Sequence, residues 1–191
     1  YTFGLNLEEL GVKLNDKGFI ITNNHFKTSI DNIYAVGDCK LGPMLAHKAS
    51  EEGTAVAEII DGQAGHVNYS AIPSVIYTAP EVASVGKTED ELKAAGITYK
   101  VGKFPFTANA KAKVMNDTGG FVKILSDNET DEVLGVHIIG ADAGNMIGEL
   151  TVAMEFGASA EDIARTCHAH PTLTESIKEA ALNVENQAIH I

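Results

Sequence analysis

Strand-like runs in the second half of the chain constrain its fold more than any other feature of the sequence. Three of them follow one another closely, with the turn-forming segment Asp127–Thr130 between the last two. Strands joined by such a short turn pair as an antiparallel hairpin, because a parallel partner needs a much longer crossover connection. Two earlier runs extend the pattern. The five predicted strands are residues 74–77, 82–85, 98–104, 120–125 and 132–139.

Helix signals flank these strands. Thr88 and Glu91 have the spacing of a capping box, in which each side chain satisfies the other residue's backbone N–H group, and Gly96 is a suitable stop. Asp142 is a suitable cap for an apolar stretch, for which a core position is favoured over an oligomer surface. We expect helices at 88–95, 143–156, 160–165 and 173–185. Strands in sequence with flanking helices predict an α+β domain with an antiparallel sheet.

The first third of the chain has a different pattern. Short strands are predicted at 18–22 and 32–37, and the apolar second run is typical of a buried strand in a parallel sheet. A helix is expected from about Met44 to Ile60. A linker-like segment follows it, so we expect two domains, residues 1–68 and residues 69–191.

Composition narrows the classes of partner. The chain carries 26 acidic and 14 basic residues, a net charge of −12. Nucleic acids and anionic membranes require basic surface, so neither is an expected partner. No apolar run approaches the ~20 residues that span a bilayer, and no signal peptide is visible. Cys39 and Cys167 form no closely spaced pair, and we expect each to be a small buried side chain rather than a reactive thiol.

An imidazole and a carboxylate stand five residues apart near the C-terminus, as His170 and Glu175. A carboxylate that holds a histidine fixes its tautomer and stabilises its protonated form, which makes a general base. The alternative is structural, because Thr172 and Glu175 also have capping-box spacing. A glutamate that reaches back to the Thr172 amide would be less free to hold an imidazole. His168 and His170 have no further ligand at a recognisable spacing, so no metal site is expected.

A second group of candidate ligand-binding residues lies in the first third of the chain. Asp38 follows the predicted strand that ends at Gly37, and carboxylates in that position of α/β folds bind ligand hydroxyl groups. The helix that starts near Met44 would offer free N–H groups to an electron-rich oxygen. The alternative is that Gly37 and Asp38 form only a turn and a helix cap.

Four segments together resemble the FAD-dependent pyridine nucleotide–disulfide oxidoreductases. Thr28–Asp38 resembles the second flavin-contacting motif of that family, and Gly42–Ala49 resembles its helix start beneath the flavin. Pro73–Val82 is similar to the entry of its dimerisation domain. Cys167–Glu175 resembles its catalytic His-Glu segment, and is more similar to members that oxidise dihydrolipoamide than to glutathione or mercuric reductases. The resemblance covers nearly the whole chain.

The resemblance implies a central domain, residues 1–68, that completes an FAD site, followed by an interface domain. Asp38 would hydrogen-bond the ribitol of FAD. The backbone around Met44, Leu45 and Ala46 would face the pyrimidine edge of the flavin, and His47 would adjoin that site.

The resemblance further implies that His170 deprotonates dihydrolipoamide and that Glu175 orients it. Electrons would pass through an enzyme disulfide and FAD to NAD, and the His-Glu pair would serve the disulfide of the other subunit of a homodimer. The lipoyl domains of 2-oxoacid dehydrogenase or glycine cleavage complexes would be partners, in the bacterial cytoplasm or the mitochondrial matrix. The alternatives are a catalytically silent dimerisation module and another disulfide reductase of the same superfamily.

The redox disulfide, the Gly-rich FAD motif and the NAD domain of the family have no counterpart in this sequence. The chain is therefore expected to be the C-terminal portion of a longer enzyme and to be inactive by itself.

Overall fold

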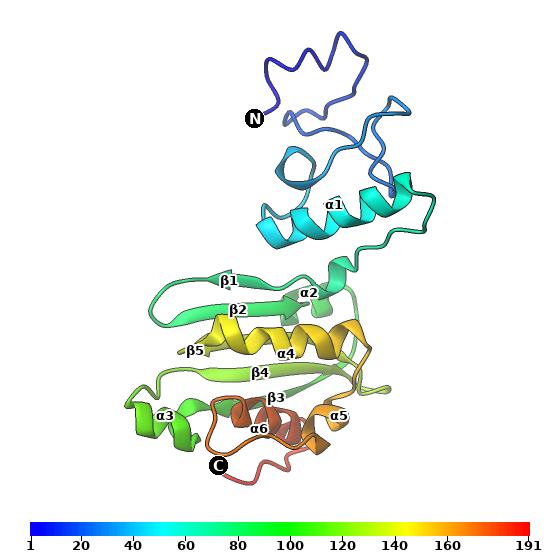
Figure 1. The fold of residues 1–191 in the computed structure, drawn as a ribbon. Coiled ribbons are helices and arrows are strands. Elements are labelled where there is room, and N and C mark those ends of the chain that lie inside the picture. The colour runs from blue at the N-terminus through cyan, green and yellow to red at the C-terminus, as the bar shows by residue number, and fades with distance from the viewer. The chain divides into compact units, whose positions relative to one another are not determined.

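The computed structural model describes residues 1–191, which divide into two compact units. Unit 1 comprises residues 1–67, and unit 2 comprises residues 68–191. Figure 1 shows that unit 1 has little regular structure apart from one helix, whereas unit 2 is built around a sheet. No helix in the chain is long and apolar enough to cross a membrane.

Unit 1 contains one α-helix, α1 (Ala46–Ile60), and a single turn of 3-10 helix at Gly37–Cys39. Its small core consists of Val12, Ile20 and Ala35, with partly buried aliphatic side chains packed around them. A core of this size removes little apolar surface from water, and hydrogen bonds in loops hold most of the unit together. The site residues of unit 1 therefore depend on loop geometry rather than on a sheet.

The two strands predicted in unit 1, at 18–22 and 32–37, do not form. Only isolated bridges occur there, because no segment of the unit runs alongside either of them as a continuous partner. The N–H of Ala35 donates to the carbonyl of Phe26 across a loop. The prediction of a parallel-sheet strand that ends at Gly37 is wrong for this chain, since Gly37 begins the 3-10 turn.

Unit 2 contains a five-stranded antiparallel sheet with the order β1-β2-β5-β4-β3. The central pair places Ile124 opposite Val136 and Lys123 opposite His137, so aliphatic residues occupy one face and polar residues the other. The strands are β1 (Ser74–Ile76), β2 (Glu81–Gly86), β3 (Tyr99–Pro105), β4 (Phe121–Asp127) and β5 (Val133–Gly140). All five predicted strands are confirmed with small shifts of their ends.

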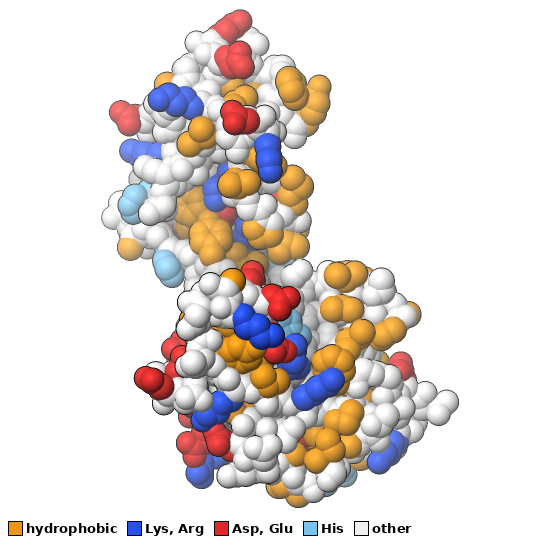
Figure 2. Space-filling model, turned by 180° about the vertical axis from the view of Figure 1, so that it is seen from behind, with side chains coloured by type: hydrophobic (Ala, Val, Ile, Leu, Met, Phe, Trp, Pro, Cys, Tyr) orange, Lys and Arg blue, Asp and Glu red, His pale blue; other side chains and the backbone are white.

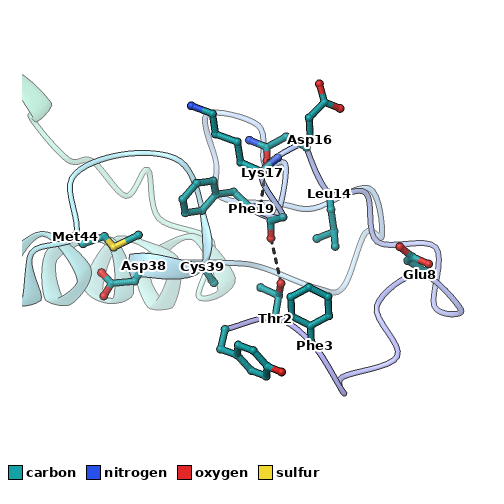
Figure 3. Close-up of a pocket in the computed structure, with 13 residues that line it drawn as sticks. Thr2, Phe3, Glu8, Leu14, Asp16, Lys17, Phe19, Asp38, Cys39 and Met44 are labelled. Atoms are coloured by element: carbon teal, nitrogen blue, oxygen red, sulfur yellow. Dashed lines mark hydrogen bonds between the residues drawn. The ribbon is translucent and has the colours of Figure 1, made fainter.

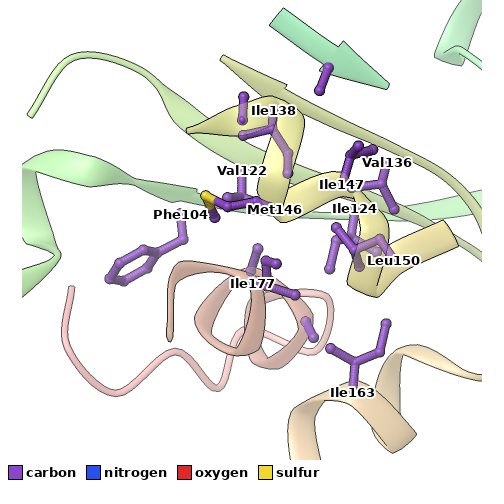
Figure 4. Packing of buried hydrophobic residues seen from close by; sticks show 14 of the residues in the cluster. Phe104, Val122, Ile124, Val136, Ile138, Met146, Ile147, Leu150, Ile163 and Ile177 are labelled. Carbon is purple, nitrogen blue, oxygen red and sulfur yellow. The ribbon is translucent and has the colours of Figure 1, made fainter. Parts of the chain in front are cut away.

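Helices cover one face of this sheet, and its core lies between them (Figure 4). Met146, Ile147 and Leu150 of α4 and Ile177 of α6 are at most 4% exposed and belong to one cluster with the strands. The helices of unit 2 are α2 (Glu89–Ala94), α3 (Ala110–Met115), α4 (Ala143–Glu155), α5 (Ala160–Arg165) and α6 (Glu175–Asn183). The predicted α+β class and the core position of α4 are confirmed.

The opposite side of unit 2 has a mixed surface. Figure 2 shows patches of hydrophobic side chains there, with Lys, Arg, Asp and Glu side chains among them. On the polar face of the sheet, Lys123 donates to Glu89 of α2 at 2.9 Å. Burial lowers the pKa of His137 on the same face.

The residues that cap the helices differ from the prediction at two helices, α3 and α4. The predicted capping box of Thr88 and Glu91 is present. Helix α3 was not predicted, because six residues give too short an apolar period to recognise. Its signal is Asn109, whose side chain accepts a hydrogen bond from Ala112 N–H. At α4 the side chain of Asp142 makes no cap bond, and Glu81 on β2 accepts from Gly144 N–H instead.

Candidate active site

The two residues predicted to form a general base are in contact. His170 Nδ1 lies 2.9 Å from Glu175 Oε1. The His170 side chain is 69% exposed, whereas that of Glu175 is 24% exposed. An ionised carboxylate can only accept hydrogen bonds, so Nδ1 carries the proton and Nε2 of the neutral ring is left as an acceptor. The arrangement is therefore suited to removing a proton from a group that approaches Nε2.

Glu175 also binds the backbone, with its second oxygen. Oε2 accepts from Thr172 N–H at 2.8 Å while Oε1 faces His170. The expected conflict between capping and holding the imidazole is wrong, because the two oxygens divide the tasks. Only half of the predicted capping box forms, since the hydroxyl of Thr172 donates to Ala169 O instead. Helix α6 begins at Glu175, so the carboxylate is fixed by the first turn of a helix.

The protonation of Glu175 follows from these contacts. Partial burial raises the pKa of this carboxyl, but the hydrogen bonds from Thr172 N–H and from His170 outweigh it. The net effect holds the pKa of Glu175 below its ordinary value. Glu175 is consequently ionised at neutral pH and holds the Nδ1 proton of His170 in place.

Asn109 fixes the loop that carries His170, and it was not predicted from the sequence. Its side chain is almost fully buried. The side-chain N–H groups donate to Thr172 O at 3.0 Å and to Ser176 Oγ at 2.9 Å, while its oxygen caps α3. One amide thus connects α3, the His170 loop and α6. The only signal in the sequence was an Asn that precedes a short run of helix formers.

His168 serves the same loop rather than a metal site. Its Nε2 lies 2.8 Å from Glu149 Oε1 on α4, and its side chain is 4% exposed. Lys178 of α6 donates to Thr166 O at 2.9 Å, immediately before the loop. No group of three or more His, Cys, Asp or Glu side chains in residues 1–191 is placed to hold a metal ion. Cys167 is exposed, so the expectation that it is buried is wrong for this residue.

The residues predicted to bind a cofactor in unit 1 surround the start of α1. Asp38 is exposed in the 3-10 turn, Met44 is exposed, and Leu45 is the half-buried N-cap of α1. Ala46 and His47 are the first two helical residues, and both are exposed. The helix therefore starts two residues later than predicted.

Asp38 and Met44 line one open hollow of about 610 Å³. Figure 3 shows both at the end of the hollow where α1 begins, with Phe19 and Leu14 farther along it. On the other side, Thr2 Oγ1 donates to Gly18 O at 3.0 Å. Free carboxylate oxygens beside a helix start are the groups that sugar-alcohol hydroxyls and an electron-rich ring edge require, so these residues fit a flavin.

A buried charge network beneath the turn was not predicted. Glu52 Oε2 accepts from Gly37 N–H at 2.6 Å, and Lys48 Nζ donates to Gly37 O at 3.3 Å. Lys40 Nζ contacts Glu52 Oε1 at 2.8 Å. Glu52 and Lys48 are at most 1% exposed and lie four residues apart on α1. The signal was an i, i+4 pair of opposite charges at positions that the helix period assigns to the inner face.

The network holds both polar groups of Gly37. The residue has φ of +73°, and an added Cβ would lie 3.1 Å from the Cβ of Ala49. Only glycine adopts this φ without cost, and a side chain at this position would also press against Ala49 of α1. Because the N–H and C=O groups of Gly37 are both bonded to α1 side chains, the backbone that carries Asp38 is held in place.

Comparisons with known proteins agree with this architecture. The family described as "Pyridine nucleotide-disulphide oxidoreductase, dimerisation domain" matches residues 72–181, and "Pyridine nucleotide-disulphide oxidoreductase" matches residues 2–53. Among solved structures, LpdA from Mycobacterium tuberculosis has a TM-score of 0.88 at 29% identity, over 94% of this chain and 39% of that one. The flavoprotein disulfide reductase RclA from Escherichia coli has a TM-score of 0.85 at 27% identity, over 93% and 41%.

Curated relatives are more similar in sequence. The dihydrolipoamide dehydrogenase of Chaetomium thermophilum is 58% identical over 100% of this chain and 38% of its own length. The mitochondrial dihydrolipoyl dehydrogenase of Mus musculus is 58% identical over 95% of this chain and 36% of its own length. This chain thus spans somewhat more than a third of these relatives. The family match over most of unit 2, together with the fold, shows that the chain belongs to the pyridine nucleotide-disulphide oxidoreductase family.

Proposed function

We propose that this chain is part of a dihydrolipoamide dehydrogenase and supplies the base that deprotonates the dithiol. The observation that carries the proposal is the 2.9 Å contact between His170 and Glu175, with Nε2 of the exposed ring left to accept a proton. Relatives that are 58% identical carry the name of this activity, and that identity supports the substrate assignment.

The chemistry needs a base near neutrality. Free thiols ionise with a pKa of about 8.5, while an unperturbed imidazole titrates at about 6.5. In the proposed reaction His170 Nε2 removes a proton from one thiol of dihydrolipoamide, and the thiolate attacks a disulfide of the enzyme. This attack forms a mixed disulfide and releases one enzyme thiolate, which takes up the proton of the second thiol. The second sulfur then attacks the mixed disulfide, closes the lipoamide ring and releases the other enzyme sulfur as a thiolate, so the enzyme disulfide is reduced. Two electrons and two protons leave the substrate, and Glu175 stabilises the charge on the imidazolium.

Unit 1 would hold the flavin in this proposal. Bound FAD would accept the electron pair and make it available to NAD. Asp38 would accept hydrogen bonds from the ribitol, and the start of α1, from Met44 to His47, would lie at the pyrimidine edge. The buried pair beneath Gly37 would keep the turn in place.

The assembly and location are proposed on the same basis. We infer a homodimer through unit 2, because the matching family is a dimerisation domain. Lipoyl domains of 2-oxoacid dehydrogenase or glycine cleavage complexes would deliver the substrate. Mitochondrial relatives favour the mitochondrial matrix, and the bacterial cytoplasm is the alternative location.

Substrate competition tests the proposal. The flavoprotein that contains this chain is assayed with dihydrolipoamide and with reduced glutathione at equal thiol concentrations. We expect turnover with dihydrolipoamide and a specificity ratio above roughly a thousandfold, because a dithiol closes its own ring in the second step. Comparable turnover with glutathione would instead favour another disulfide reductase of the family.

A second function applies to the isolated 191 residues. Cys39 and Cys167 are both free thiols, so the chain contains no disulfide to receive electrons. This observation favours a catalytically silent dimerisation module. The test is a visible spectrum of the purified chain after incubation with FAD and desalting. A colourless dimer supports the silent module, and a retained flavin band together with dithiol oxidation contradicts it.

A further inference from the structure

The start of α1 carries a buried positive charge. Lys48 is the third residue of that helix, and its side chain is 1% exposed. Its Nζ donates to Gly37 O at 3.3 Å, and a Cβ added at Gly42 would lie 3.6 Å from the same nitrogen. The ammonium group therefore lies against the loop that runs from the 3-10 turn to the start of α1. Asp38 and Met44 of this loop line the hollow of Figure 3.

A lysine in this position opposes the usual arrangement of charge in a helix. The peptide dipoles make the first turn of a helix partially positive, so carboxylates are stabilising there and cations are not. The first turn of α1 contains no acidic residue, and its N-cap, Leu45, has no side-chain oxygen to accept the free N–H groups. The whole chain carries 26 acidic and only 14 basic residues, so composition does not account for a buried cation here. The helix dipole and Lys48 thus add to one another.

Glu52 compensates this charge only in part. Its Oε1 lies 3.6 Å from Lys48 Nζ and 2.8 Å from Lys40 Nζ. The side chain of Glu52 is fully buried, and that of Lys40 is 12% exposed. One carboxylate therefore faces two ammonium groups, and the cluster retains one positive charge. Charges inside a protein are screened far less than charges in water, so this one acts on groups beyond its own contacts.

We propose that the charge of Lys48 stabilises the reduced flavin and so raises its reduction potential. This inference rests on the proposed function, in which the start of α1 lies at the pyrimidine edge of the ring. Two electrons from the dithiol, passed on by the enzyme disulfide, and one proton leave one negative charge on that edge. A fixed positive charge stabilises it without any rearrangement of the protein. Lys48 acts across the helix start and makes no contact with the ring.

The reduction potential is measured in the flavoprotein that contains this chain. Each protein is equilibrated without oxygen with a reference dye of known potential, and the absorbance bands of flavin and dye give the fraction of each that is reduced. Lys48→Met removes the charge and keeps a side chain of similar length. The equilibrium constant for flavin reduction should fall roughly tenfold, which is about 30 mV for a two-electron couple.

Glu52→Gln makes the opposite change of charge. It removes the carboxylate from the same cluster, while the amide oxygen can still accept from Gly37 N–H. The equilibrium constant for flavin reduction should rise by roughly threefold or more, because two ammonium groups remain. Shifts of the same sign in the two variants would overturn the proposal, since lost packing or lost hydrogen bonds have no preferred sign of charge. The sign of the Glu52→Gln shift decides the proposal even where Lys48→Met retains no FAD.

Two controls separate the buried charge from other effects. Lys48→Arg keeps the charge, so its equilibrium constant should stay within roughly threefold of the original. Glu51→Gln removes an exposed carboxylate next to Glu52, which water and salt screen, so its potential should also stay unchanged. A shift in Lys48→Arg as large as that in Lys48→Met would overturn the role of the charge. A rise in Glu51→Gln equal to that in Glu52→Gln would overturn the role of the buried cluster.

The dye titration requires neither dihydrolipoamide nor NAD, so its outcome is independent of the substrate assignment. Shifts of opposite sign in a flavoprotein that does not oxidise dihydrolipoamide would support the role of Lys48 and overturn the proposed substrate. Equal potentials in the original protein, Lys48→Met and Glu52→Gln, with dihydrolipoamide oxidation intact, would overturn the role of Lys48 alone. Absence of bound FAD from the original protein would overturn both proposals.

Discussion

Glu175 holds His170 with one carboxylate oxygen and uses the other to bind the backbone of the same loop. Oε1 lies 2.9 Å from His170 Nδ1, and Oε2 lies 2.8 Å from Thr172 N. The carboxylate is held by these two hydrogen bonds and by the position of Glu175 in the first turn of α6. The ring it holds is therefore pre-oriented with Nε2 free, which is the geometry a proton acceptor needs.

Removal of the charge on Glu175 should affect activity and stability together. In Glu175→Gln the amide retains one acceptor oxygen, so either His170 or the Thr172 N–H loses its partner. We expect dihydrolipoamide oxidation in the flavoprotein to fall by roughly a hundredfold, because an imidazole without its carboxylate is a less well oriented base. The free energy of unfolding of the chain should fall by about 1–3 kcal/mol.

The matched control is Glu161→Gln, at an exposed glutamate on α5 that pairs with Arg165. Its effect on stability should stay below about 0.5 kcal/mol, because exposed ion pairs contribute little. Turnover kinetics and urea unfolding provide the two measurements. Equal losses in both variants would show that the Glu175 contacts have no special role.

Acid should destabilise unit 2 through specific carboxyls. The folded-state pKa values of Glu175 and Asp162 lie below their ordinary values, the first held by Thr172 and His170 and the second by Ser159. A lowered carboxyl pKa contributes stability that is fully present above the unfolded-state pKa of about 4 and is lost as pH falls through the folded-state value. Urea midpoints should therefore be flat near neutrality and fall steadily below about pH 4.5.

Ser159→Ala tests the origin of this acid loss. The substitution removes the hydroxyl of the α5 capping box, which donates to Asp162 at 2.8 Å. The stability profile of this variant should be lower near neutral pH and less steep in acid than that of the original chain. A slope identical to the original would show that the Ser159 hydroxyl does not contribute to the acid loss, since the backbone N–H of residue 159 still donates to Asp162.

The buried charges beneath Gly37 should be strongly coupled. Glu52→Ala leaves Lys48 buried without its i, i+4 partner, and removal of one member of a buried pair costs about 3–5 kcal/mol. The double substitution Lys48→Met with Glu52→Leu should recover much of that loss. Urea unfolding of the two single variants and the double variant is the measurement, because every substitution of Glu52 removes the acceptor of the Gly37 N–H and so changes local exchange in any case. Additive effects of the two single substitutions would contradict the coupling.

Helix α4 allows a test of the core with an internal control. Leu150 is fully buried between helix and sheet, as Figure 4 shows, and Val152 two residues later is 59% exposed. Leu150→Ala should cost about 3–5 kcal/mol through lost contacts and a cavity, while Val152→Ala should cost about 0.5 kcal/mol or less. Thermal unfolding distinguishes the two. Similar losses would mean that the face assignment of α4 is wrong.

The sequence predicted unit 2 well and unit 1 poorly, for physical reasons. In unit 2, strands that follow one another in the sequence pair with each other, as β4 pairs with β5 across the turn after Asp127. The turn residues and the alternation of apolar side chains therefore determine which residues pair. The apolar run that ends at Gly37 has no partner ladder in this chain, and periodicity alone could not reveal that. An apolar run of this kind has the same pattern whether or not a partner strand lies beside it.

In the candidate active site, contacts between residues close in sequence were predicted, and contacts between distant residues were missed. The spacing of His170 and Glu175 left a contact and a helix cap as alternatives, and the resemblance to the family favoured the contact that the structure shows. Contacts between residues far apart in sequence, such as Asn109 with Ser176, had no local signature. Glu52 beneath Gly37 was missed although the helix period places it on the inner face, since a charged residue on a helix is ordinarily assigned to the solvent face.

Rapid reduction of the flavin by dihydrolipoamide in His170→Gln tests whether His170 accepts the proton of the dithiol. The flavoprotein that contains this chain is mixed with the dithiol, and flavin absorbance is followed over a single turnover. We expect a rate lower by roughly a hundred- to ten-thousandfold, with unchanged FAD content and unchanged NADH-driven reduction of a dye at the flavin. Flavin reduction at the original rate would contradict it.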